Sequence, residues 1–144
     1  MFLDNAMKRE KPEFDLVAHW TGSSRPEGDL NWLNTRNNGR GSVGYNCIIG
    51  KDGARYILAD PKTHWMHNTG CGTGFDKTTI SIAFSALNAE DKITEDQIKS
   101  FREYKAELEE WCTIKSFSCH AELNRNKQDF PAEIWEQLKK KLKD

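Results

Sequence analysis

Residues 14 to 20 read Phe14-Asp15-Leu16-Val17-Ala18-His19-Trp20 and form a short, mainly apolar run. Such a run, bounded by turn-forming residues, is typical of a strand buried in a sheet. A second run, Ile114-Lys115-Ser116-Phe117-Ser118-Cys119, leads directly into His120. Open sheets tend to present reactive side chains where their strands end. The two runs therefore predict a sheet with a histidine at the end of each of two strands.

A carboxylate completes this pair of histidines. Asp129 follows His120 by nine residues, and Lys127 lies two residues before that aspartate. Two imidazoles and one carboxylate can hold Zn²⁺ and leave a fourth position open for water. The pattern favours metal-assisted hydrolysis.

The length, charge and apolar content of the chain indicate which classes of protein it can belong to. A chain of 144 residues is most simply one domain with a real core, and it has no apolar run long enough to span a membrane. The net charge of -1 gives no general basic field, so we expect neither a nucleic-acid partner nor membrane insertion. Residues 1–10 lack the apolar stretch of a secretory signal, which predicts synthesis in a cytoplasm.

Turn and periodicity signals predict the remaining elements. The Asp52-Gly53 pair between 43–49 and 54–58 predicts an antiparallel hairpin, and residues 60–77 form a long loop. Thr94 and Gln97 form a capping box that opens a helix. The core-facing stripe of that helix should be Ile98, Phe101, Tyr104, Leu108 and Trp111. We also expect a short helix at 29–37 and a strand at 78–84. A last helix should follow Pro131 and turn Ile134, Trp135, Leu138 and Leu142 inward.

These elements predict one α/β or α+β domain, with a mixed central sheet flanked by helices. We expect a lead-in over residues 1–13 and the domain itself over 14–144.

Three other constellations offer alternative chemistry. His64 and His67 have a spacing that would place both on one face of a helix, but they lie in the long loop. Residues 70–78 superficially resemble a phosphate-binding loop, yet Asp76 stands where that loop needs glycine before its lysine. Cys119 is a possible nucleophile, but neighbouring side chains of a strand point to opposite faces, so only one of Cys119 and His120 can enter a shared site.

The motifs, in their order, resemble the zinc-dependent N-acetylmuramoyl-L-alanine amidases of type 2, most closely the small phage lysozyme type. The resemblance runs from about Asp15 to Trp135. It is carried by Val17-Ala18-His19, by Gly44-Tyr45-Asn46-Cys47-Ile48-Ile49-Gly50-Lys51-Asp52-Gly53, by His67 ahead of Thr79-Ile80-Ser81-Ile82, and by His120 with Lys127-Gln128-Asp129. Asn46 stands where histidine is common in the family, and Ser81 replaces the usual glycine.

The resemblance implies an amidase or peptidoglycan-recognition-protein-like fold and a role for each matching residue. His19, His120 and Asp129 would bind one Zn²⁺ per chain, with aspartate in place of the cysteine of the phage lysozyme type. Tyr45 and Lys127 would be the catalytic pair. The residues expected to line the substrate groove are His67, Trp20, Gly70 and Gly72.

The implied activity is hydrolysis of the amide bond between N-acetylmuramic acid and the L-alanine of the stem peptide, as in a phage endolysin. Such an enzyme would be made as a monomer in the cytoplasm of an infected bacterium and would act on the cell wall after release. Two alternatives stay open: a non-catalytic peptidoglycan-binding module of the same fold, and a cytoplasmic amidase that recycles muropeptides. Some phage amidases also bind a host polymerase, a role that the sequence does not address.

Overall fold

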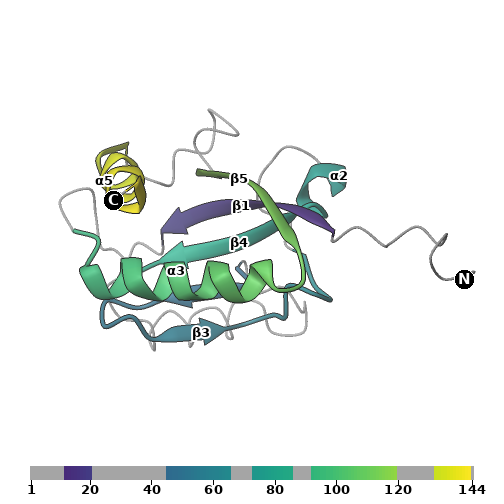
Figure 1. Ribbon diagram of the computed structural model, residues 1–144, viewed down its shortest axis with the longest axis horizontal. Coiled ribbons are helices and arrows are strands. Elements are labelled where there is room, and N and C mark those ends of the chain that lie inside the picture. The colour runs from purple at the N-terminus through teal and green to yellow at the C-terminus, as the bar shows by residue number, and fades with distance from the viewer. Residues whose placement is uncertain (1–11, 21–44, 66–72, 86–91, 120–131, 144) are drawn as a thin grey trace, which may run out of the picture.

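The computed structural model describes residues 12–20, 45–65, 73–85, 92–119 and 132–143 (Figure 1). The described elements are β1 (Glu13–Trp20), β2 (Cys47–Ile49), β3 (Arg55–Ile57), α2 (Thr73–Asp76), β4 (Thr79–Phe84), α3 (Glu95–Glu109), β5 (Thr113–Cys119) and α5 (Ala132–Lys143). None of the helices in these ranges has the length and apolarity needed to cross a membrane.

The strands form one mixed sheet in the order β3-β2-β4-β1-β5. β1 runs parallel to β4 and β5, β4 runs parallel to β2, and only β3 is antiparallel to its neighbour. The predicted mixed central sheet is therefore confirmed. In Figure 1 the parallel strands point toward the same side of the molecule, so their carboxyl ends share one edge of the sheet.

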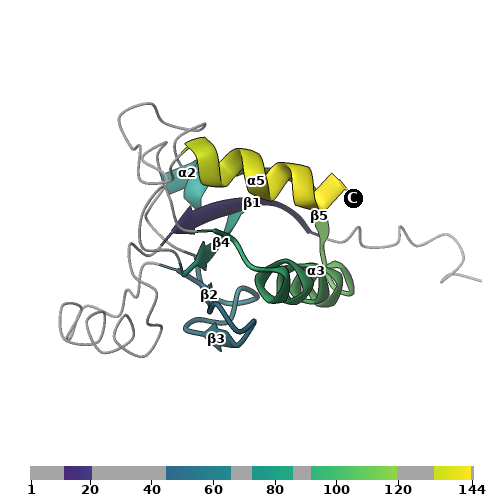
Figure 2. The same ribbon diagram turned by 90° about the vertical axis from the view of Figure 1, so that its left-hand side faces the viewer.

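The main core lies between one face of this sheet and the two long helices. Leu16 and Ala18 of β1 are fully buried in a cluster that includes Phe101 of α3 and Leu138 of α5. Because side chains alternate along a strand, Asp15, Val17 and His19 face the other way. The two long helices, α3 and α5, thus cover the same face of the sheet (Figure 2). His19 belongs to the opposite face by the alternation of side chains along β1.

The predicted hairpin is confirmed, and its turn depends on Gly53. Cys47 pairs with Ile57 and Ile49 with Arg55 in an antiparallel ladder. Gly53 has a φ of +85°, a conformation that residues with a Cβ rarely adopt. A Cβ there would also lie 2.8 Å from the backbone oxygen of Asp96, so the turn packs tightly against the first turn of α3.

The first turn of α3 has the predicted capping box. The Thr94 hydroxyl accepts a hydrogen bond from the backbone N of Gln97 at 3.0 Å, and Gln97 Oε1 accepts from the backbone N of Thr94 at 2.9 Å. Gln97 is fully buried, and its Nε2 donates to the carbonyl of Ile49, the last residue of β2, and to that of Ser85, the residue after β4. The capping residue therefore also ties the helix to the sheet.

The structure differs from the sequence-based expectations in two places. The stretch 60–77 is not one continuous loop, because Thr73–Asp76 forms the short helix α2. β5 is an edge strand and not a buried one, since Lys115 and Ser116 are exposed. The helix expected at 29–37 lies outside the described residues. Of the expected core stripe, Trp111 lies beyond the end of α3 and is half-buried.

Candidate functional site

His19 lies near the carboxyl end of β1, in the interior of the sheet. Its side chain is 1% exposed, and it is paired in register with Ala83 of β4. Ala83 is in turn paired with Ile48 of β2. The residues beside His19 on the neighbouring strands, Ala83 and Ile48, are therefore apolar. His19 lies where the parallel strands end, as the sequence predicted for this histidine.

Tyr45 is the second predicted site residue that the structure describes. The centroid of its ring lies 5.3 Å from that of His19, with the ring planes tilted by 48°. Tyr45 is half-buried and also packs against the cluster of Ile48 and Ala83. The structure therefore brings together two residues that are 26 positions apart in the sequence.

The end of β5 lies beside the end of β1. Cys119 is paired in register with Ala18, so each strand reaches this point one residue before a histidine in the sequence. Cys119 is 2% exposed and belongs to the core cluster on the helix-covered face, together with Ala18. A thiol on that face is directed away from the face of His19, which argues against Cys119 as the nucleophile of a shared site.

A bulge in β5 determines this arrangement. Phe14 pairs with Ile114, but the next residue, Asp15, pairs with Ser116, so Lys115 is an extra residue on the edge strand. Beyond the bulge, Ser116 and Ser118 share the face of Asp15 and Val17. The single inserted residue thus sets which side chains of β5 face the core.

The other predicted site residues lie outside the described part of the chain: His67, Gly70, Gly72, His120, Lys127 and Asp129. The backbone of Trp20 ends β1 opposite Phe84, but its side chain is not described. Among the described residues no three His, Cys, Asp or Glu side chains gather closely enough to hold a metal ion. All three predicted zinc ligands, His19, His120 and Asp129, therefore remain predictions.

Asp15 is a buried carboxylate on the same face of β1, and the sequence analysis had not singled it out. It is 8% exposed, accepts a hydrogen bond from the Ser116 hydroxyl, and lies 3.9 Å from the ammonium group of Lys115. It lies four positions before His19 on the same strand, which is a distance of about 13 Å. These contacts give Asp15 a structural role in joining β1 to β5.

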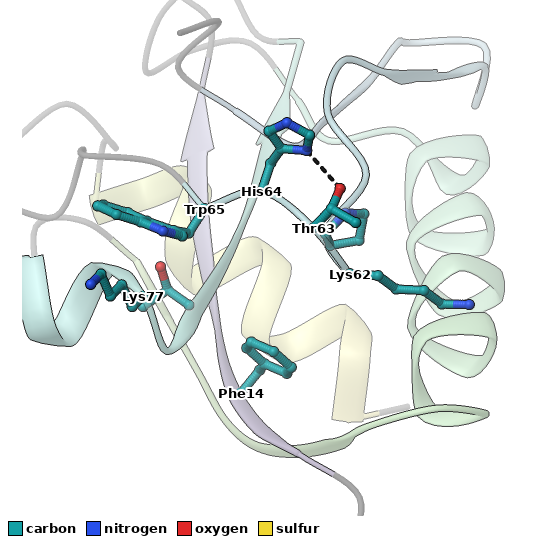
Figure 3. A pocket seen from close by; sticks show the side chains of 8 residues that line it. Phe14, Lys62, Thr63, His64, Trp65 and Lys77 are labelled. Atoms are coloured by element: carbon teal, nitrogen blue, oxygen red, sulfur yellow. Dashed lines mark hydrogen bonds between the residues drawn. The ribbon is translucent and has the colours of Figure 1, made fainter. Parts of the chain in front are cut away.

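A small pocket lies near Phe14, at the start of β1, whereas His19 lies near the end of the same strand (Figure 3). Its volume is about 120 Å³, well below the roughly 300–1,000 Å³ of most small-molecule sites. Figure 3 shows Lys62 and Lys77 on either side of it, each with its ammonium group at the end away from the pocket centre. Those groups lie over the rings of Trp111 and Trp65, at 5.5 and 5.6 Å from the ring centroids.

His64 borders this pocket, and it is exposed. Its Nδ1 lies 2.7 Å from the Thr63 hydroxyl (Figure 3). His67, its partner in the alternative pair, lies outside the described residues.

Comparison with solved structures shows the same fold in several proteins. The ectodomain of the Drosophila transmembrane receptor PGRP-LCa is 19% identical, with 87% of this chain and 81% of that one covered and a TM-score of 0.71. The amidase LysC of Clostridium intestinale is 21% identical, with 93% and 86% covered and a TM-score of 0.66. The endolysin of the Thermus scotoductus bacteriophage Ph2119 is 18% identical, with 94% and 88% covered and a TM-score of 0.62.

A comparison with curated proteins found no match. The family model for N-acetylmuramoyl-L-alanine amidase matches residues 10–133, nearly the whole domain. This span includes the buried His19, the adjoining Tyr45, and the sequence motifs around His120 and Asp129. The chain therefore belongs to the N-acetylmuramoyl-L-alanine amidase family.

Proposed function

We propose that this protein is a zinc-dependent N-acetylmuramoyl-L-alanine amidase of the endolysin type. It would cleave the amide bond that joins N-acetylmuramic acid to the L-alanine of the stem peptide in the bacterial cell wall. We further propose that it acts as a monomer, and that it is made in the cytoplasm of an infected bacterium and reaches the wall after release.

The observation that carries this proposal is the position of His19. A fully buried imidazole at the end of a strand, beside a tyrosine ring at 5.3 Å, combines a metal-binding donor with a phenolic hydroxyl. The neighbouring strand β5 ends at Cys119, beside Ala18, so the two strand ends lie side by side. His19 follows Ala18 and His120 follows Cys119 in the sequence. This pairing of the two strand ends supports the proposal that both histidines serve one site.

The residues fit a zinc ion by their chemistry. Imidazole nitrogen and carboxylate oxygen are ordinary zinc ligands, and three of them leave a position for a substrate or water. We propose that His19, His120 and Asp129 hold the ion. A bound zinc ion would polarise the amide carbonyl and lower the pKa of a water molecule toward neutrality.

The other proposed residues act on the charge that develops during the reaction. Lys127 would donate to the carbonyl oxygen as it becomes negative, and loss of such a donor typically costs on the order of 10²–10³ in rate. Tyr45 would orient the attacking water or the same oxygen through its hydroxyl. His67, Trp20, Gly70 and Gly72 would line the groove, where glycine lets a peptide backbone approach closely.

A second candidate function is binding without catalysis. It is favoured by the likeness to the receptor ectodomain of PGRP-LCa, whose fold this chain shares. We favour the enzyme because the sequence supplies a third ligand, Asp129, which a protein that only binds peptidoglycan does not need. A cytoplasmic amidase that recycles soluble muropeptides would catalyse the same reaction on a smaller substrate.

The decisive experiment measures zinc and activity together. Purified protein should hold about one zinc per chain, and chelation with EDTA should abolish the loss of turbidity of a peptidoglycan suspension. His120→Ala should lose the zinc, and an unchanged zinc content in that variant would refute the ligand assignment.

Lys127→Ala should keep the zinc and the fold but lose activity by about 10²–10³. Full activity in that variant would remove Lys127 from the mechanism. Comparing the hydrolysis of intact sacculi with that of soluble fragments distinguishes an endolysin from a recycling enzyme.

A further inference from the structure

Asn46 connects three segments of the chain, and it follows Tyr45 directly. It is fully buried and lies directly before β2. Its backbone N donates to the carbonyl of Ser81 on β4 at 2.9 Å. Its own carbonyl accepts from the backbone N of Leu58 at 2.9 Å and from that of Ala59 at 3.3 Å.

The side-chain amide of Asn46 is equally occupied. Oδ1 accepts from the backbone N of Ser81 at 3.0 Å. Nδ2 donates to the carbonyls of Ala59 and His64, both at 3.2 Å. One carboxamide thus joins β4 to the segment that leaves β3.

The carboxamide of asparagine matches the hydrogen-bonding needs of these partners. The site needs one acceptor for an N–H group and two donors for two carbonyls, which is the inventory of a carboxamide. An aspartate would direct a carboxylate at the carbonyls of Ala59 and His64, and a histidine, common here in the family, has a different shape and one proton fewer to donate when neutral.

Tyr45 is the residue directly before this anchor in the chain. Tyr45 lies two residues before the regular part of β2, which begins at Cys47. The backbone joins it to Asn46, whose donors and acceptors are fixed on β4 and on the 58–64 segment. The centroid of the Tyr45 ring lies 5.3 Å from that of His19.

We propose that Asn46 is a positioning residue, which holds Tyr45 against His19 and fixes the segment ending at His64 to the sheet. This proposal rests on the proposed function only where it predicts an effect on catalysis. The predicted effect on the contact between Tyr45 and His19 does not require activity.

The test compares two buried amides that differ in location. Asn46→Ala removes the anchor beside Tyr45. Gln97→Ala is the matched control, because Gln97 is also fully buried and bonded to three backbone groups, but on α3. Both variants should lower the melting temperature, since each leaves buried backbone groups without partners.

Two measurements, made well below the melting temperature of both variants, separate positioning from stability. In NMR spectra, Asn46→Ala should lose the cross-peaks between the rings of Tyr45 and His19, and Gln97→Ala should keep them. In amidase assays, kcat should fall at least about tenfold in Asn46→Ala and stay within about twofold of the wild type in Gln97→Ala.

Retained ring cross-peaks in Asn46→Ala would overturn the proposal, and so would an equal loss of kcat in both variants. If the wild type shows no amidase activity, the proposed function fails, while the NMR comparison still decides the role of Asn46. Asn46→Asp provides a further check: it keeps the acceptor and loses both donors, so the contact should be weakened in it as well.

Discussion

The two positions at which the sequence departs from the family pattern are hydrogen-bonded neighbours. The backbone N and O of Ser81 both bond to Asn46, one to its side chain and one to its backbone. In the sequence these two positions are 35 residues apart and nothing links them. The side chain of Asn46 extends the pairing of β2 with β4 by one position before its first regular pair, Cys47 and Ile82. This link depends on the two strands lying side by side, so the sequence alone does not reveal it.

At the residue scale, the thiol of Cys47 should be chemically inert. Cys47 is fully buried on the helix-covered face, and burial raises the pKa of its thiol from 9.0 to about 12. At pH 8 its thiolate fraction is then about a thousandfold below that of an ordinary thiol, and the thiolate is the reactive form.

Iodoacetamide labelling followed by peptide mass spectrometry measures this reactivity. Cys47 should label at least about a thousandfold more slowly in the folded protein than in urea. Because burial favours the neutral thiol, the labelling rate should keep rising with pH toward 12 and should not level off near 9. Labelling at pH 8 as fast as in urea would contradict the burial of this side chain.

At the scale of elements, the hairpin and the first turn of α3 depend on one glycine. Gly53→Ala should destabilise the protein by more than about 1 kcal/mol, because alanine disfavours a positive φ and its Cβ would meet the Asp96 backbone at 2.8 Å. Gly74→Ala is the control, since a Cβ there would meet nothing within 4 Å. Urea unfolding of both variants measures the difference, and equal stabilities would contradict the turn geometry.

An ion pair between Arg55 and Glu107 joins β3 to α3, and its contribution to stability should depend on pH. Two nitrogens of Arg55 bond to the two carboxylate oxygens of Glu107, at 2.8 and 2.9 Å, and the hydrogen bond lowers the pKa of Glu107. A lowered pKa stabilises the folded state above the ordinary value of 4.5, and this contribution disappears as the pH falls through the folded pKa.

Because the side chain of Glu107 is 56% exposed, solvent screens the pair. Glu107→Gln should therefore cost no more than about 1 kcal/mol at pH 7, and almost nothing at pH 3. Chemical unfolding at the two pH values measures both numbers. A loss that is equal at pH 3 and pH 7 would show that the charge of Glu107 is not its source.

At the scale of the whole molecule, zinc should stabilise the fold through the strand ends. A ligand that binds only the folded state adds about 2.7 kcal/mol at a hundred times its dissociation constant, which raises the melting temperature by roughly 5–10 °C in a domain of this size. Calorimetry with and without zinc measures the shift. His19→Ala should abolish it, and Tyr45→Phe, which keeps all three proposed ligands, should retain it; an undiminished shift in His19→Ala would exclude His19 as a ligand.

The sequence by itself determined the elements whose signals are local. The apolar run ending at His19, the Asp52-Gly53 turn and the capping box of Thr94 and Gln97 each depend on residues close together in the chain, and the structure confirms them. The family, too, was recognisable from motifs in order. The assignment of domain boundaries at residues 13 and 14 remains a prediction.

Only the tertiary structure decided which faces these elements share. The extra residue Lys115 in β5 reverses the alternation of every later side chain, so Cys119 enters the core beside Ala18. The ring of Tyr45 meets His19, and Asn46 satisfies backbone groups up to 35 positions away. Such contacts depend on strand register and long-range pairing, which no local preference of the chain encodes.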